Sequence, residues 1–211
     1  MTETPMTEDT TGGQILQKTA RGLFWNLSSY GLSKLILLIT TSILARLLSK
    51  DDFGLVALAV VAINYLAIVK DLGLGTALIQ RQDEVNKAAN TVFTLNLIFG
   101  MLLSAILIPL SPLVAEYFKN PMVTPVLRWL GLSFFISAIG SVHRVWLMRE
   151  MDFRRKLVPD MGSALIKGIV SIGLALTGYG VWSLVFGQLV GALSSAILFW
   201  IVVPWRPHFV L

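Results

Sequence analysis

The stretch VWSLVFGQLVGALSSAILFWIVV (residues 181–203) is 23 residues long and contains no Asp, Glu, Lys or Arg. A helix of about 20 apolar residues crosses the hydrocarbon core of a bilayer, which is about 30 Å thick. A surface helix of a soluble protein needs a polar face, which Gln188 and a few serines do not supply. The stretch therefore predicts a transmembrane helix.

Five earlier stretches follow the same pattern, so we expect an all-α polytopic membrane protein with six transmembrane helices. The expected spans are roughly 24–48, 53–72, 89–114, 123–147, 158–177 and 181–203. Proline has no backbone N–H to donate, so Pro109 and Pro112 are expected to interrupt the third span. The chain divides into a disordered polar tail (1–13), an amphipathic interfacial helix (14–23), a six-helix transmembrane lobe (24–205) and a cytoplasmic end (206–211).

Composition excludes several other classes of protein. Of 211 residues, 55% are hydrophobic and only 14% are charged, whereas soluble domains carry about 25% charged residues. The chain has no cysteine and two histidines, so we expect no Cys/His metal site. Since the sequence also lacks nucleotide-binding loops and catalytic motifs, we expect no cofactor and no enzyme activity. The net charge of +5 indicates loops held against anionic lipid, and no nucleic-acid partner.

The distribution of Lys and Arg predicts the orientation of the chain. Of the 17 such residues, eleven fall on one side of the expected membrane, four on the other and two within spans. The richer side is cytoplasmic by the positive-inside rule, and an even number of spans then places both termini inside. The basic run at 149–156 fits a topology determinant, with recognition of lipid headgroups as the alternative. Its basic residues are Arg149, Arg154, Arg155 and Lys156.

Two lysines fall at bilayer depth, Lys34 in the first span and Lys167 in the fifth. A lysine at the centre of a membrane helix costs about 2.5–3.5 kcal/mol, so such residues usually face a water-filled cavity or a partner. Snorkelling to the interface is the alternative for both, and pairing with a neighbouring acid is a further one for Lys34. Gly187 and Gly191 form a GxxxG pattern, which is typical of close helix packing.

Polar residues mark the faces that could line such a cavity. Asn26 and Tyr30 share a helical face with Lys34, while Asn90 and Gln188 begin weaker stripes on other spans. Asp160 shares a face with Lys167 and is either a charge near the start of its helix or an ion-coupling group. Asp71, beside Lys70, is either an interfacial pair or a second coupling group.

Three sequence blocks resemble one family. ARLLSKDDFGLVALAVVAINYLAIVKDLGLGTALIQRQD (45–83) is similar to the first hairpin of bacterial polysaccharide transporters of the multidrug/oligosaccharidyl-lipid/polysaccharide exporter superfamily. It has their Arg-Leu-Leu, an acidic link ending in Phe-Gly, and Asp-Leu-Gly. LMREMDFRRK (147–156) resembles the family's cytoplasmic link. GYGVWSLVFGQLVGA (178–192) with Trp-Arg-Pro (205–207) resembles its last helix and exit.

The resemblance implies a two-lobe, MATE-like fold of which this chain is the N-terminal half. It also implies a flippase of O-antigen, colanic-acid or exopolysaccharide type in the bacterial inner membrane. Such transporters move undecaprenyl-pyrophosphate-linked glycans between leaflets by alternating access, for lipopolysaccharide, exopolysaccharide or capsule. The implied partners are membrane lipid, this substrate, a second lobe or second copy, and the polysaccharide assembly machinery. Whether the chain is a fragment, a truncated product or a half completed by another chain stays open.

The residues suggest how an anionic glycolipid would be held, because fixed cations lower the cost of moving negative charge through a low-dielectric core. The cationic candidates are Lys34, Lys167, Arg128 and Arg46, and the sugar-binding candidates are Asn26, Tyr30, Asn90 and Gln188. One alternative is a multidrug or cation antiporter of the same superfamily, which calls for buried acids and aromatic residues. Others are a non-transporting membrane fragment or scaffold, and a membrane-embedded transferase, for which His143 lacks an acidic neighbour in sequence.

Overall fold

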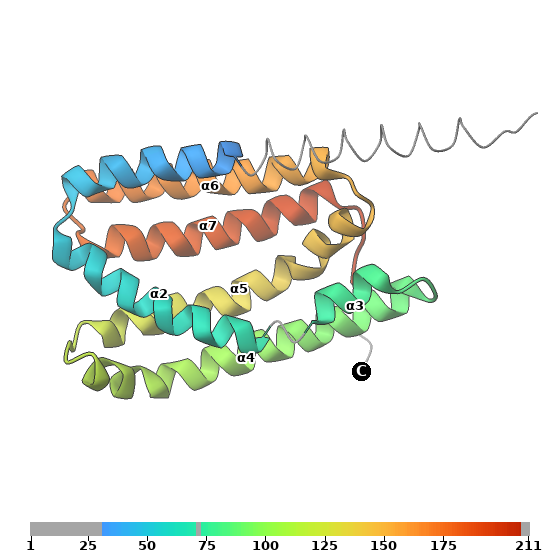
Figure 1. Ribbon diagram of the computed structural model, residues 1–211, viewed down its shortest axis with the longest axis horizontal. Coiled ribbons are helices and arrows are strands. Elements are labelled where there is room, and N and C mark those ends of the chain that lie inside the picture. Colours follow the sequence, from blue (N-terminus) through green and yellow to red (C-terminus); the bar gives the residue numbers. More distant parts are fainter. Residues whose placement is uncertain (1–30, 71–72, 208–211) are drawn as a thin grey trace, which may run out of the picture.

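The helices account for nearly all of the described chain. The computed structural model describes residues 31–70 and 73–207. A first helix occupies residues 31–47, and six labelled helices follow it (Figure 1). They are α2 (Lys50–Lys70), α3 (Leu74–Gln80), α4 (Val85–Tyr117), α5 (Val123–Arg149), α6 (Phe153–Leu176) and α7 (Val181–Val202). The expected tail, the expected interfacial helix, Asn26, Tyr30 and Asp71 lie outside the described residues.

Helices α4, α5, α6 and α7 are each long and apolar enough to cross a membrane. Their outward faces carry large apolar side chains, among them Ile98 and Met101 on α4 and Ile169 on α6. Such a surface suits lipid, because a soluble protein covers its helices with polar residues. The described chain contains helices and no strand, so the expectation of an all-α, multi-pass membrane protein is confirmed.

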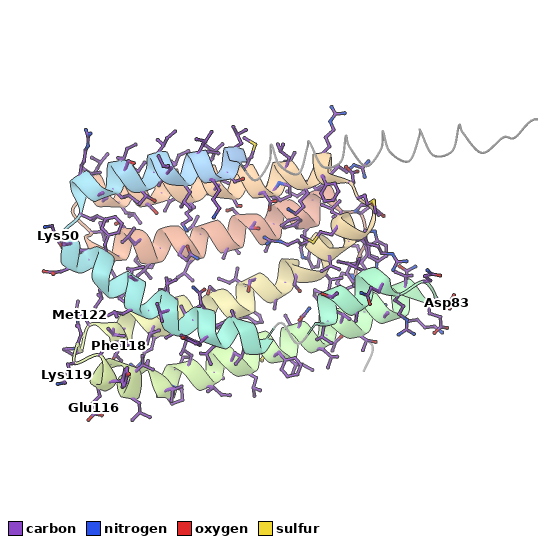
Figure 2. The ribbon with its side chains drawn as sticks, in the orientation of Figure 1. Lys50, Asp83, Glu116, Phe118, Lys119 and Met122 are labelled. Carbon is purple, nitrogen blue, oxygen red and sulfur yellow. The ribbon has the colours of Figure 1, made fainter. Side chains whose placement is uncertain are left out.

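Helix α5 is the centre of the arrangement, since it packs against α2, α3, α4, α6 and α7. The first helix lies along α6 (Figure 1), and a Cβ atom added at Gly168 of α6 would lie 2.6 Å from Thr40 Oγ1 of the first helix. Figure 2 shows that Lys50, Glu116, Phe118, Lys119 and Met122 lie together at one end of the molecule, with Asp83 at the other. We call these the Lys119 end and the Asp83 end.

The apolar core lies where α2, α4, α5 and α7 meet. Leu107 of α4, Leu127 and Leu130 of α5 and Val185 of α7 are fully buried there. A tight turn links α6 to α7 through Gly178 (φ 83°) and Gly180 (φ 53°). Glycine adopts this left-handed backbone without a steric penalty. The turn brings α6 and α7 side by side.

One expectation about α4 is wrong: the helix continues through Pro109 and Pro112 to Tyr117. A proline frees the carbonyl four residues earlier, which for Pro112 is that of Ile108. The Ser111 hydroxyl donates to this Ile108 carbonyl oxygen at 2.8 Å. A neighbouring side chain thus replaces the lost backbone donor, as happens at prolines in membrane helices.

Helix α3 is a further element that the sequence did not predict. It begins after Gly73, whose φ is 73°, and it packs against α4 and α5. Arg149 at the end of α5 donates from Nη1 to the carbonyl oxygens of Leu78 (3.1 Å) and Arg81 (2.5 Å). These carbonyls belong to the last turn and C-cap of α3, where backbone acceptors lack helical partners. Arg149 therefore fixes the short helix to α5.

Candidate functional site: a cationic cavity

A cavity of about 770 Å³ lies between the first helix, α5, α6 and α7. Its charged lining residues are Lys34, Arg144, Lys156, Asp160 and Lys167. Serines from all four helices and Gln188 of α7 complete the polar part of the wall. In a chain with 14% charged residues, this grouping of four cations with one acid makes the cavity electropositive.

Lys167 lies near the middle of α6, and its Nζ donates to Gln188 Oε1 on α7. Gly191 of α7 allows the two helices to approach here, because a Cβ atom added at Gly191 would lie 2.9 Å from Lys167 Cβ. The aliphatic part of the lysine therefore packs over the glycine, and its ammonium group meets an amide oxygen inside the cavity wall. The GxxxG pattern thus serves close packing of α7 on α6.

Lys156 and Asp160 form an ion pair one turn apart on α6, with 2.8 Å between Nζ and Oδ2. Both side chains line the cavity, and they are only 14% and 21% exposed. The sequence grouped Lys156 with the basic run that faces the membrane surface. In the structure it is separated from Arg155, whose Nε lies 3.3 Å from Oδ2 of Asp152 and whose side chain is 60% exposed.

Arg144 of α5 is a cavity residue that the sequence reasoning missed. Its guanidinium lies 5.0 Å from the centre of the Phe199 ring, and Nη2 lies 3.5 Å from Ser195 Oγ. Ser137, Ser141 and Arg144 follow the i, i+4, i+7 spacing of one helix face, and all three line the cavity. That spacing was the signal that could have identified Arg144.

Lys34 of the first helix lines the cavity from the side opposite α5, beside Ser33. The structure therefore brings together five of the residues predicted from the sequence: Lys34, Lys156, Asp160, Lys167 and Gln188. Close positive charges in a medium of low dielectric attract anions much more strongly than they do in water. The arrangement suits a small, multiply charged anionic group.

The other predicted cations lie elsewhere. Arg128 of α5 donates from Nε to Ser111 Oγ at 3.1 Å, which joins it to the proline-containing part of α4. Arg46 is exposed near the end of the first helix, and Arg154 is exposed on α6. None of these is part of the cavity lining, and neither is Asn90, which is buried within α4.

His143 is fully buried on another face of α5, stacked on Trp200 with 4.7 Å between ring centroids. Trp205 packs edge-on against it at 5.4 Å. Within residues 31–70 and 73–207, no three His, Asp or Glu side chains form a potential metal site. His143 thus packs among aromatic rings, away from the cavity lining.

Residues 43–211 match a family model described as polysaccharide biosynthesis protein. The chain is 32% identical to the succinoglycan biosynthesis transport protein ExoT of Rhizobium meliloti (strain 1021), over 82% of this chain and 35% of that protein. It is 29% identical to the teichuronic acid biosynthesis protein TuaB of Bacillus subtilis (strain 168), over 69% of this chain and 31% of that protein. It is 25% identical to the lipopolysaccharide biosynthesis protein WzxC of Escherichia coli (strain K12), over 66% and 28%.

The chain thus spans about a third of the length of these relatives. No solved structure matches it. The family model covers most of the described helices, including α5, α6 and α7, which contribute most of the cavity wall. This chain belongs to the polysaccharide biosynthesis protein family.

Proposed function

We propose that this chain forms one lobe of a transporter that moves anionic lipid-linked oligosaccharide units across the bacterial inner membrane. The observation that carries the proposal is the cavity, which four cations and one acid line, three of its four wall helices being long and apolar enough to cross a membrane. Relatives named for succinoglycan transport, teichuronic acid biosynthesis and lipopolysaccharide biosynthesis support the same substrate class.

The cavity suits the diphosphate that joins a glycan to its polyprenyl carrier. Lys34 and Lys167 lower the cost of bringing negative charge below the membrane surface. Gln188 and the cavity serines offer hydrogen bonds to sugar hydroxyl groups, while the polyprenyl tail stays in the surrounding lipid. The substrate needs no cofactor, and the chain performs transport without covalent catalysis.

We further propose that the first helix and α2 are the remaining two of six spans, and that a second lobe faces the cavity. A polar cavity open to lipid would be unfavourable, since charged groups in hydrocarbon need partners or water. The second lobe comes from the same or another chain, and rocking of the lobes exposes the cavity alternately. The Asp83 end is cytoplasmic because the basic residues concentrate there, so both termini are inside.

The test is to replace Lys34 or Lys167 by alanine in the gene product that carries this chain, in a host deleted for that gene. We expect surface polysaccharide to fall at least about tenfold, which corresponds to about 1.4 kcal/mol in the barrier. Immunoblotting of membranes should show unchanged protein levels. Lys50→Ala is the control, because Lys50 is exposed at the Lys119 end and outside the cavity lining. Normal polysaccharide in both cavity variants would contradict the proposal.

A cation or drug antiporter fits the cavity less well. A cationic substrate calls for free acids, yet Asp160 is the one acid among the described residues that line the cavity, and it is paired with Lys156. A drug-susceptibility assay in the same deletion strain distinguishes the two functions. Loss of drug resistance with normal polysaccharide would favour the antiporter.

A further inference from the structure

We propose that Asp160 is a positioning residue that promotes release of the anionic substrate by competing with it for Lys156. This inference rests on the proposed function. In the structure, the Asp160 carboxylate lies 2.8 Å from the Lys156 ammonium. When the diphosphate arrives, Lys156 exchanges the carboxylate for a phosphate oxygen, and the carboxylate later takes the lysine back.

The position of the pair supports exchange. Both side chains line the cavity and are mostly buried, so an anion in the cavity meets Lys156 and Asp160 together. Another ion pair within one helical turn, Lys87 with Glu84, is also close, at 2.6 Å, but its side chains are 77% and 56% exposed and lie outside the cavity. The Lys156–Asp160 pair is thus placed where a substrate can break it.

An exchange of partners costs Lys156 less free energy than the loss of its only partner in this pair. Removing a buried cation from its partner without replacement is costly, but replacing a carboxylate by a phosphate oxygen keeps the lysine paired throughout. Because the anion must displace the carboxylate from Lys156, the carboxylate keeps the affinity for the anion moderate. Transport through a multi-site pathway needs binding that is strong enough to admit the substrate and weak enough to release it.

Lys156 and Lys167 bind separate partners, Asp160 and Gln188. They are eleven residues apart, or about 16 Å along α6 at 1.5 Å per residue. Because each lysine has its own partner, the anion exchanges with Asp160 at Lys156 and with Gln188 at Lys167 as separate events. Asp160 therefore acts at the step in which the anion leaves Lys156.

The experiment measures pyrophosphate binding by calorimetry, using the purified protein in phosphatidylcholine nanodiscs. Asp160→Asn should lower the Kd about threefold to tenfold, the effect of removing one competing ion pair. In a Lys156→Gln background, most of this gain should disappear, because the carboxylate acts through that lysine. Asp160→Glu keeps a carboxylate at this position and should leave the Kd close to that of the wild type. Glu84→Gln removes the same charge outside the cavity and should leave it unchanged.

Transport gives the second readout. Asp160→Asn should reduce surface polysaccharide although it binds pyrophosphate more tightly, a combination that misfolding does not produce. Weaker or unchanged binding in Asp160→Asn would overturn the release role, as would an equal gain in the Lys156→Gln background. In that case weakened binding in Lys167→Gln would still support the proposed function, whereas normal binding in both lysine variants would overturn it. Displacement of pyrophosphate by added phosphatidylglycerol would overturn the diphosphate assignment in favour of phospholipid headgroups.

Discussion

Helix α5 has two different halves, and the contrast between them separates stability from function. Its first half presents Leu127 and Leu130, which are fully buried in the apolar core with α2, α4 and α7. Its second half presents Ser137, Ser141 and Arg144, which line the cavity with the first helix, α6 and α7. One helix therefore contributes both to the close-packed contact between α4 and α5, which we call the seam, and to the polar wall of the cavity.

This difference follows from the bilayer as a solvent. Lipid tails are as apolar as leucine, so helices associate in membranes through close packing and hydrogen bonds. At Gly100 of α4 the seam is so close that an added Cβ atom would lie 2.8 Å from the Phe134 carbonyl oxygen of α5. Polar side chains instead collect around the cavity, where they are not enclosed by apolar neighbours.

The largest effect should come from placing the same amide in the apolar core and on the cavity wall. Leu130→Gln buries an amide without a partner in the core, so we expect a loss of about 2–4 kcal/mol in the free energy of unfolding. Ala192→Gln places the amide on the cavity wall and should change stability by less than about 0.5 kcal/mol. Thermal unfolding in detergent, followed by size-exclusion chromatography, measures both. Equal losses would show that the apolar core and the cavity wall do not differ in how well they tolerate a polar side chain.

Glycine substitutions should give the next largest difference. Gly100→Ala forces the seam apart and should cost about 1–3 kcal/mol. Gly173 of α6 has no atom within 4 Å of an added Cβ, so Gly173→Ala should instead stabilise the helix by about 0.5–1 kcal/mol. The same unfolding measurement applies. Unchanged stability in Gly100→Ala would mean that the seam is looser than described.

Arg128→Ala tests a cation that the sequence assigned to the substrate and the structure places against Ser111. Loss of this hydrogen bond should lower stability by about 1 kcal/mol. Surface polysaccharide should fall much less than in Lys167→Ala when the two are assayed at equal membrane levels. A tenfold fall in surface polysaccharide with Arg128→Ala would indicate that Arg128 acts in transport.

The smallest effect is expected from Arg155→Gln. Its ion pair with Asp152 is largely exposed, and exposed pairs contribute less than about 1 kcal/mol. Unfolding temperature should shift by at most about 2 °C, given the size of the chain. Comparison with Lys156→Gln, one residue further along, tests whether a basic residue buried in the cavity contributes more to stability than an exposed one.

The sequence predicted the long helices because apolar length is a local property, and it placed the α6–α7 turn correctly from two glycines. It did not predict the continuity of α4, because the rescue of the Ile108 carbonyl depends on the rotamer of Ser111. It favoured a cavity or a partner for Lys34 and Lys167 because charge at bilayer depth is costly, and the structure puts both on the cavity wall. Their role in transport stays a prediction.

Arg144 and Arg128 show which part of the site the sequence could not predict. Both lie on α5, and although spacing groups Arg144 with Ser137 and Ser141, it does not say which neighbouring helices each arginine meets. Arg144 contacts Ser195 and Phe199 on α7, 51 and 55 residues later in the chain. Arg128 contacts Ser111 on α4. The helix that packs on each half of α5 therefore decides which arginine reaches the cavity.

The glycine at position 191 has a genetic consequence. Because the stem of Lys167 lies against it, any side chain there would push the ammonium group away from Gln188. A missense change at Gly191, which has no side chain, would then be expected to reduce surface polysaccharide in the same way as loss of Lys167. Suppressors of such an allele should map to small replacements on the facing turn of α6.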